Sequence, residues 1–324
     1  MAPLQILICG AGIAGPALAT FLLLQSTDSI SNLPHITILE RSPNPEATYG
    51  QNIDIRGSGA TIMRKLGLES AVRAYSTLEE GVQIVDEKNQ IWSQGAADKS
   101  GKIQTGTSDK EILRGDLARI IGDRLREVSA SVEAQGGRGV EWIYGDTLDS
   151  IDQDDATSAR VRFAKSQKTR AFDLVVGADG VMSTTRRLAF GASGEPDRIK
   201  HLGMYQAFFS LPSGPTDSNW RRWFHAPGRR GIMIRPTGKP DRSTALMYVL
   251  STTDERLPAA AREGRRGVER QKALMAEYFQ DLSWECPRLI KEMKEAEDFY
   301  YDPVAQVHIE SWSTGRVVLL GDAG

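Results

Sequence analysis

Three glycines near the N-terminus have the spacing at which a backbone turn can approach a phosphate group. Gly10, Gly12 and Gly15 form a G-x-G-x-x-G pattern, with Ile13 and Ala14 between the second and third glycine. In such a turn the first glycine permits a tight bend, the second lets the backbone approach a pyrophosphate, and the third lets a helix pack on a strand. The pattern therefore predicts a turn whose N–H groups, at the start of a helix, bind the phosphates of a dinucleotide.

The residues around these glycines predict the elements that such a turn needs. Residues 4–9 form an apolar run typical of a buried strand, residues 16–24 are compatible with a helix, and residues 36–40 predict a second strand that ends in Glu40. A carboxylate at that place accepts hydrogen bonds from the hydroxyl groups of a ribose. NAD and FAD both contain an adenosine ribose, so Glu40 does not choose between them. A glycine-rich turn without a ligand is the alternative interpretation.

Two later strands also end in a carboxylate. Residues 172–177 are followed by Asp179 and Gly180, and residues 315–320 are followed by a turn that contains Asp322. Ligands bind at the carboxyl ends of the strands in parallel α/β sheets. These acids suit hydroxyl-rich groups such as ribose and ribitol, although an Asp-Gly turn is also common without any ligand. The three signals together predict a nucleotide-binding α/β fold.

Four motifs, in their order along the chain, resemble those of a known family. They are G-A-G-I-A-G with Glu40 and Arg41, L-R-G-D-L at residues 113–117, G-A-D-G-V-M-S-T-T-R at residues 177–186, and G-R-V-V-L-L-G-D-A at residues 315–323. Over essentially the whole chain the sequence resembles the FAD-dependent aromatic hydroxylases, or group A flavoprotein monooxygenases. The resemblance implies that Arg114 contacts the FAD phosphates, that Asp179 serves the FAD and pyridine-nucleotide region, and that Asp322 binds the flavin ribityl chain.

A further stretch indicates a branch of this family. Residues 50–57, G-Q-N-I-D-I-R-G, resemble the tetracycline-inactivating and polyketide-tailoring enzymes. The expected FAD-binding residues are Gly10, Gly12, Ile13, Ala14, Gly15, Glu40, Arg41, Arg56, Arg114, Asp179, Gly180 and Asp322.

The resemblance also implies the chemistry. In this family NADPH or NADH reduces FAD, oxygen adds to flavin C4a, and the hydroperoxide transfers oxygen to an electron-rich aromatic or polyketide-like small molecule. Hydroxylation, epoxidation and Baeyer–Villiger insertion share this intermediate, and the sequence does not separate them, although hydroxylation or epoxidation is the expected outcome. No catalytic side chain or metal is expected, because the cofactor carries the reaction. A flavin-dependent reductase of the same fold is one alternative. An inactive FAD-binding fragment is another, because the chain stops at Gly324 while relatives continue. The later motifs argue against a simple NAD-dependent dehydrogenase.

The predicted architecture is α/β with two domains. A discontinuous Rossmann-like FAD-binding domain, like that of para-hydroxybenzoate hydroxylase, is expected to comprise residues 1–80, 105–195 and 285–324, with its C-terminal part truncated. An inserted, largely antiparallel β-sheet is expected to form the substrate domain from residues 81–104 and 196–284, because residues 203–252 contain aromatic-rich strands. Residues 263–279 predict one charged helix.

Substrate contacts are expected on the inserted sheet. Gln206 lies on the strand that faces the substrate in tetracycline-modifying relatives, and Phe208 and Trp223 could line a pocket for a flat molecule. Basic residues crowd the same segment, where they would bind an acidic group or protect a solvated sheet edge. They are Arg221, Arg222, Arg229, Arg230, Arg235, Lys239 and Arg242.

Composition excludes several other classes of protein. The chain has 324 residues, enough for about two domains, and its formal net charge of −2 disfavours a nucleic-acid partner. Its two cysteines, Cys9 and Cys286, cannot form a disulfide framework or a cysteine zinc site. The uncharged stretch at residues 2–27 is interrupted by glycines and a proline, which disfavours a membrane span. These features predict a cytoplasmic protein that binds small molecules, and they indicate no particular oligomeric state.

Overall fold

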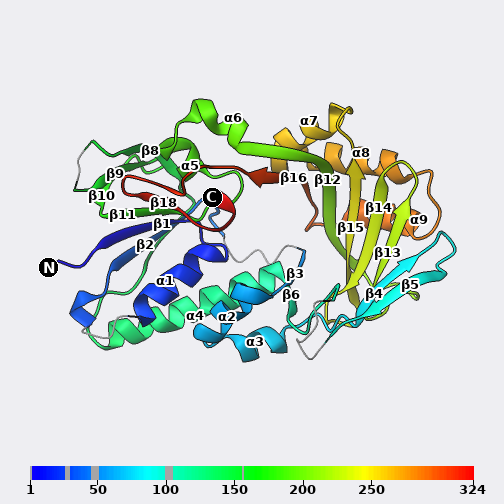
Figure 1. Ribbon diagram of the computed structural model, residues 1–324, viewed down its shortest axis with the longest axis horizontal. Helices are drawn as coiled ribbons and strands as arrows, with labels where there is room; N and C mark the ends of the chain where they lie inside the picture. The colour runs from blue at the N-terminus through cyan, green and yellow to red at the C-terminus, as the bar shows by residue number, and fades with distance from the viewer. Residues whose placement is uncertain (1, 26–29, 45–50, 99–104, 155–156) are drawn as a thin grey trace. The chain divides into compact units, whose positions relative to one another are not determined.

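The computed structural model describes residues 2–25, 30–44, 51–98, 105–154 and 157–324 (Figure 1). The chain forms two units, each assembled from separate segments of the sequence. The parallel-sheet unit comprises Met1–Ala47, Leu117–Lys200 and Ala305–Gly324. The antiparallel-sheet unit comprises Thr48–Asp116 and His201–Val304.

A six-stranded sheet organises the parallel-sheet unit. Its strand order is β17-β18-β11-β1-β2-β7, and all neighbours are parallel except β17 and β18. The strands are β1 (Gln5–Cys9), β2 (His35–Glu40), β7 (Glu141–Tyr144), β11 (Leu174–Gly177), β17 (Ser313–Thr314) and β18 (Val317–Leu319). A separate antiparallel sheet consists of β8 (Leu148–Asp152), β9 (Ala159–Phe163) and β10 (Thr169–Phe172).

Strand β1 is buried on both faces, which explains its unbroken apolar sequence. Ile6 and Ile8 pack in a core with residues of helices α1 (Ala14–Leu24) and α4 (Arg114–Ala134). Leu7 and Cys9 pack in another core with residues of the three-stranded sheet. The shorter helices of this unit are η1 (Ile30–Asn32), α5 (Thr184–Ala189), η2 (Ala192–Gly194), α6 (Glu195–Arg198) and η4 (Gly321–Ala323).

A seven-stranded sheet organises the antiparallel-sheet unit. Its order is β16-β12-β15-β14-β13-β4-β5, in which β13 and β4 run parallel while β12–β15, β15–β14, β14–β13 and β4–β5 run antiparallel. The strands are β4 (Gly81–Val85), β5 (Ile91–Ala96), β12 (Ile199–Pro212), β13 (Trp220–Ala226), β14 (Arg230–Pro236), β15 (Arg242–Leu250) and β16 (Tyr300–Val307). A two-stranded ladder joins β3 (Asn52–Asp54) and β6 (Glu111–Leu113), and helices α2 (Gly57–Lys65) and α3 (Glu69–Ala74) follow β3.

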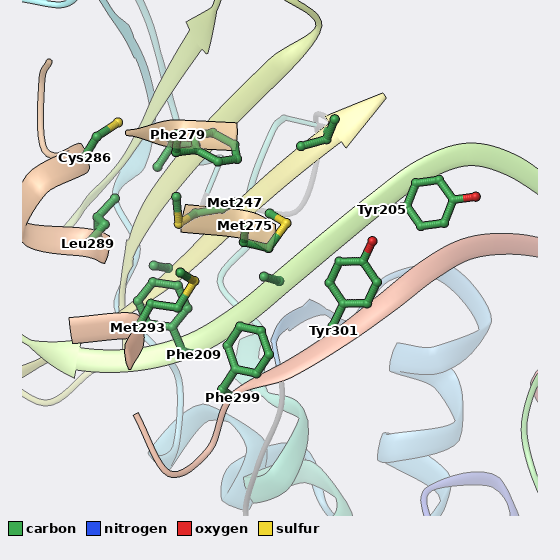
Figure 2. Close-up of a cluster of buried hydrophobic side chains, with 14 of the residues drawn as sticks. Tyr205, Phe209, Met247, Met275, Phe279, Cys286, Leu289, Met293, Phe299 and Tyr301 are labelled. Carbon is green, nitrogen blue, oxygen red and sulfur yellow. The ribbon is translucent and has the colours of Figure 1, made fainter. Parts of the chain in front are cut away.

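Helices cover one face of the seven-stranded sheet. They are α7 (Arg256–Glu263), η3 (Gly264–Gly267), α8 (Val268–Phe279) and α9 (Cys286–Glu295). Figure 2 shows Met275, Leu289 and Met293 of these helices packed with Phe209 and Met247 of the sheet. The single helix expected at residues 263–279 is wrong, because Gly264 takes a φ of +55° and ends α7 before α8 begins.

The predicted fold class agrees with this architecture. The two compact units have other boundaries than the predicted domains. Residues 51–80, 105–116 and 285–304 pack within the antiparallel-sheet unit, and residues 196–200 pack within the parallel-sheet unit. The predicted division concerns which segments hold FAD and which hold substrate, and it stays a prediction.

Candidate cofactor and substrate sites

The carboxyl ends of neighbouring parallel strands bring the sequence motifs of the parallel-sheet unit together. The N–H of Ala178, after β11, donates to the carbonyl of Cys9 at 2.7 Å. The N–H of Leu320, after β18, donates to the carbonyl of Gly177 at 2.8 Å. The glycine turn after β1, the Asp-Gly turn after β11 and the Gly-Asp turn after β18 therefore lie at one edge of the sheet.

The glycine turn has the geometry that a bound pyrophosphate requires. Gly10 has a φ of +112°, and a Cβ there would lie 2.3 Å from the carbonyl oxygen of Ala178. A Cβ at Gly15 would lie 2.0 Å from the carbonyl oxygen of Gly10. A Cβ at Gly12 would meet no atom within 4 Å. Two glycines are thus needed by the fold itself, whereas Gly12 faces open space.

Helix α1 begins directly after this turn and presents its first N–H groups to that space. The helix starts at Ala14, and Ile13 at the N-cap position makes no side-chain capping bond. The first N–H groups of a helix have no intrahelical partner and carry partial positive charge. A phosphate would satisfy them, so these residues fit the FAD pyrophosphate.

Glu40 ends β2 beside the glycine turn. Its carboxylate accepts hydrogen bonds from the N–H of Ala11 at 2.9 Å and from the N–H of Ser42 at 2.8 Å. These two bonds hold the carboxylate at the strand end where a ribose would lie. Arg41, the next residue, is exposed.

Asp179 holds its own loop. Its carboxylate accepts hydrogen bonds from the N–H of Thr185 at 3.0 Å, from the Thr185 hydroxyl at 3.1 Å and from the Ser183 hydroxyl. Gly180 has a φ of +80°, a conformation that glycine adopts most readily. Burial and the charge of Asp179 raise the pKa of the Cys9 thiol, which keeps that sulfur protonated and unreactive.

Asp322 lies exposed in the short helix η4. A Cβ at the preceding residue, Gly321, would lie 3.3 Å from Cβ of Ala14, the first residue of α1. The Gly-Asp turn therefore borders the start of α1, close to the glycine turn. In the parallel-sheet unit the predicted cofactor residues Gly10, Gly12, Ile13, Ala14, Gly15, Glu40, Arg41, Asp179, Gly180 and Asp322 all lie at or next to the carboxyl ends of β1, β2, β11 and β18.

Two arginines of the predicted FAD-binding set, Arg56 and Arg114, lie in the other unit. Arg56 donates from Nε to Asp54 at 2.9 Å and from Nη2 to the carbonyl of Thr105 at 2.6 Å. Arg114 is exposed at the start of α4, and its N–H donates to the carbonyl of Gln51 at 3.0 Å. Their role in FAD binding stays a prediction. Gly50, the first residue of the branch motif, is outside the described residues.

The predicted substrate residues share one face of the seven-stranded sheet. Along β12, Tyr205, Ala207 and Phe209 belong to the core under the helices. Because side chains alternate along a strand, Gln206 and Phe208 point to the opposite face. Trp223 does the same on β13, since its neighbour Phe224 belongs to that core. We call the face opposite α7, α8 and α9 the open face.

Strand register arranges the open face in rows. One row is apolar and runs across four strands, through Phe208, Leu246, Met233 and Trp223. The neighbouring row is more polar and consists of Gln206, Tyr248, Gly231 and His225.

Tyr248 is the residue of this face that sequence reasoning missed. Trp223 Nε1 donates to its hydroxyl at 3.2 Å, and His225 Nδ1 lies 3.4 Å from the same oxygen. Burial raises the pKa of Tyr248, while the bond from Trp223 opposes that rise. The tyrosine therefore stays a neutral phenol next to Gly231, where an added Cβ would lie 2.2 Å from ring atom Cζ of Tyr248. The glycine in strand β14 is the sequence signal that could have indicated this close approach.

Replacing Gly231 by alanine is expected to displace Tyr248 from this position. Overpacking of this kind typically costs about 1–3 kcal/mol of unfolding free energy. Urea unfolding should show that loss, and FAD affinity should not change, because the glycine turn belongs to the other unit. Replacing Gly95 by alanine is the matched control, since a Cβ there meets no atom within 4 Å. Equal stability of both variants would contradict the expectation.

Four arginines of the basic segment, Arg221, Arg222, Arg230 and Arg235, pair with carboxylates of the protein. Arg221 and Arg235 both contact the buried carboxylates of Glu79 and Glu111. The other members vary: Arg222 pairs with Asp217, Arg230 pairs with Asp281, and Arg229 and Arg242 are exposed. We call Glu79, Glu111, Arg221 and Arg235 the ionic quartet.

A small cavity of about 20 Å³ lies beside the quartet, lined by Arg235, Asn52 and Thr244 among other residues. It has room for about one water molecule. Phe208 and Tyr300 also line this cavity, and their stacked rings have centroids 4.9 Å apart. The Tyr300 hydroxyl donates a hydrogen bond to the side chain of Gln51. Gln51 and Asn52 of the branch motif thus border the open face.

Within the described ranges, no cluster of histidine, cysteine, aspartate and glutamate has an arrangement that could hold a metal ion. No helix in the described part of the chain has the length and apolarity to cross a membrane.

Comparison with known proteins places the chain in a family. The profile of the FAD-binding domain family matches residues 3–324. The FAD-dependent monooxygenase asL6 of Sarocladium schorii is 34% identical, over 99% of this chain and 74% of the relative. The flavin-dependent monooxygenase eupH of Phoma sp is 33% identical, over 100% of this chain and 71% of the relative. The crystal structure of the tetracycline destructase Tet(51) matches with a TM-score of 0.74 and 29% identity, over 100% of this chain and 76% of that one.

The chain therefore belongs to the FAD-binding flavoprotein monooxygenases, a family of oxidoreductases. The resemblance inferred from the four motifs is confirmed, and so are the FAD cofactor and the tetracycline-inactivating branch.

Proposed function

We propose that this enzyme uses NADPH or NADH and molecular oxygen to hydroxylate or epoxidise an electron-rich aromatic or polyketide-like small molecule. The observation that supports this proposal most is that the chain contains both features. One unit has an open glycine turn, and the other unit has an apolar row on the open face of its sheet. The first suits the FAD pyrophosphate, and the second suits a flat ring system.

The parallel-sheet unit would hold the cofactor. The N–H groups at the start of α1 would bind the pyrophosphate, Glu40 would accept hydrogen bonds from the adenosine ribose, and Asp322 would bind the ribityl chain. Asp179 would border the region of FAD and pyridine nucleotide. FAD, when bound, supplies the redox chemistry that takes up electrons from the pyridine nucleotide and activates oxygen.

The open face would hold the substrate. Phe208 and Trp223 offer aromatic surface to a flat ring, because aromatic groups stack favourably on one another. Gln206 and Tyr248 lie in the adjoining row and offer hydrogen-bonding groups to oxygen substituents at the ring edge. The name of Tet(51) states that this relative destroys tetracycline, a polycyclic molecule rich in oxygen substituents. A substrate of that general kind fits both rows.

The side chains of the protein would orient and shield the substrate without forming a bond to it. Burial raises the pKa of both cysteine thiols, Cys9 and Cys286, so neither is a nucleophile. Both thiols are free and buried, which favours a reducing, cytoplasmic location as part of this proposal.

Oxygen consumption tests the proposed reaction. Purified enzyme with FAD and NADPH, or NADH in a parallel assay, is mixed with tetracycline, an anthraquinone or a naphthalenediol. We expect at least one of these substrates to stimulate oxygen uptake, and we expect mass spectrometry to detect one labelled oxygen atom in the product made under isotopically labelled oxygen. A reduced product formed without oxygen uptake would instead indicate a flavin-dependent reductase.

Replacing Gln206 by alanine is expected to weaken substrate binding and leave FAD binding unchanged. Loss of one neutral hydrogen bond in a buried site costs about 1–2 kcal/mol. Titration with the best substrate of the panel, followed by flavin absorbance, measures the change in Kd. The control is Gln83→Ala on strand β4, because that side chain bonds to Gln94 on β5. A variant that loses FAD yet retains substrate affinity would contradict the assignment.

A further inference from the structure

Arg186 is a fully buried arginine with no assigned role in the reaction. It lies in helix α5, at the last position of the motif that begins with Gly177, and none of its surface is exposed. Burying a guanidinium is costly unless hydrogen bonds and an opposite charge compensate it. Its contacts therefore indicate why the fold retains it.

The guanidinium joins two turns that lie far apart in the sequence. Its Nη2 donates to the carbonyl of Val181 at 2.6 Å, and Val181 follows the Asp179–Gly180 turn. Its Nη1 donates to the carbonyl of Ala323 at 2.8 Å, and Ala323 follows Asp322. One side chain thus connects the two turns that carry the carboxylates of the proposed FAD site.

A half-buried acid balances the charge of Arg186. Glu195, at the start of α6, accepts hydrogen bonds from Nε at 3.0 Å and from Nη2. The planar guanidinium can make all of these bonds at once because its donors point outward in one plane. A lysine has a single nitrogen and cannot reach the same set of acceptors.

The strand ladder alone does not hold the Asp322 turn. Strand β18 ends at Leu319, and the last bond to the neighbouring strand comes from the N–H of Leu320 to Gly177. Beyond that point the short helix η4 has a local bond from the N–H of Gly324 to Gly321, and the bond from Arg186 to Ala323. The long-range bond from Arg186 therefore ties the turn that carries Asp322 to the turn that carries Asp179.

We propose that Arg186 is a positioning residue for FAD, which acts by holding the Asp322 turn against the Asp179 turn. This inference rests on the proposed role of Asp322 in binding the ribityl chain. Arg186 itself contacts no cofactor atom in this proposal. Its effect on FAD affinity must therefore pass through Asp322, and that requirement separates positioning from general structural support.

A double-mutant cycle on the full chain tests this requirement. The variants are Arg186→Lys, Asp322→Asn and the combination, and the measurement is the Kd for FAD from quenching of flavin fluorescence. We expect each single change to raise the Kd for FAD by about tenfold. If the double variant also shows only about a tenfold increase, the coupling between the two residues is about tenfold, which is within the usual range for residues that share one network. We expect the Kd of the double variant to equal that of the single variant that binds FAD less tightly, because each change removes the same interaction.

Two results would overturn the inference. One is an increase in Kd for the double variant that equals the product of the two single increases. The other is an unchanged Kd for Asp322→Asn, which would leave Arg186 without a target. If FAD does not bind at the glycine turn at all, a different result is expected, because the Gly12→Val variant would then bind FAD as tightly as the unchanged protein.

Two further variants complete the experiment, one as a control and one as a substitute for Arg186→Lys. Arg198→Lys is the matched control, because Arg198 also lies near Glu195, at 3.6 Å, but bonds to the carbonyls of Phe190 and Gly191 instead of Ala323. It should leave the Kd within about twofold and show no coupling to Asp322→Asn. If Arg186→Lys does not fold, Glu195→Gln takes its place in the cycle, because it weakens the anchor of the guanidinium; its effect must also be coupled to Asp322→Asn.

Discussion

Replacement of Gly12 by valine is expected to abolish FAD binding while the protein stays folded. The reason is that a Cβ at this position meets no protein atom within 4 Å, so the valine side chain occupies the space that a pyrophosphate needs. Flavin absorbance of the purified variant and a titration with FAD measure the loss, and circular dichroism measures the secondary structure. We expect an increase in Kd of more than about a hundredfold, since the phosphates can no longer reach the N–H groups of α1.

Two other glycines provide the controls for this variant. Gly95→Val introduces the same bulk at an open position of strand β5 and should retain FAD. Gly15→Val should lose the fold as well as the cofactor, because a Cβ there would lie 2.0 Å from the carbonyl oxygen of Gly10. Equal FAD affinity of the Gly12 variant and the unchanged protein would refute the assignment of this turn.

The second large effect is expected at the ionic quartet, where Arg235→Ala should destabilise the antiparallel-sheet unit. Arg235 donates from Nε to Glu79 at 3.0 Å and from Nη2 to Glu111. Without it, the two buried carboxylates retain Arg221 as their cationic partner among the described residues, while Asn52 and Thr107 still donate to Glu111. Removing one partner of a buried ion pair costs about 3–5 kcal/mol. Urea unfolding gives the free energy directly, and Arg242→Ala, at an exposed position, is the control with the same change in charge.

The loss of stability should depend on pH. Burial raises the pKa of Glu111 above its ordinary value of 4.5, and the charge of Arg235 opposes that rise. In the variant the folded state therefore holds the Glu111 proton more tightly than the unfolded state does. The destabilisation is absent below the unfolded pKa and grows as the pH rises above it. Urea unfolding at about pH 5 and about pH 7 should show the larger loss at about pH 7; equal losses would contradict this account.

Much of the cofactor site could be predicted from the sequence because its signals are local. The positive φ of Gly10, the helix that starts at Ala14 and the carboxylate of Glu40 after a strand all depend on residues within one short segment. Apolar runs then predict the parallel strands, and the ends of parallel strands meet at one edge of a sheet. The alternation along β12 likewise places Gln206 and Phe208 on one face before any fold is known.

The quartet and the contacts of Tyr248 could not be predicted in this way. Arg221 bonds to the buried carboxylates of Glu79 and Glu111, each of which lies more than a hundred positions away in the sequence. Tyr248 lies next to Gly231 only because β14 and β15 pair in one particular register. The residues near Arg221 and Tyr248 in the sequence do not indicate these contacts.

The sequence by itself therefore determined the class of fold, the glycine turn before a helix and the family, because glycine spacing and apolar periodicity are properties of short segments. The tertiary structure alone decided that Arg186 bonds to Ala323 across 137 positions, that Arg221 and Arg235 pair with buried carboxylates, and that Gly264 separates two helices. The physical reason is the same in each case. Burial removes water from these polar groups, and their hydrogen bonds must then be completed by whichever residues the packed strands and helices bring within reach.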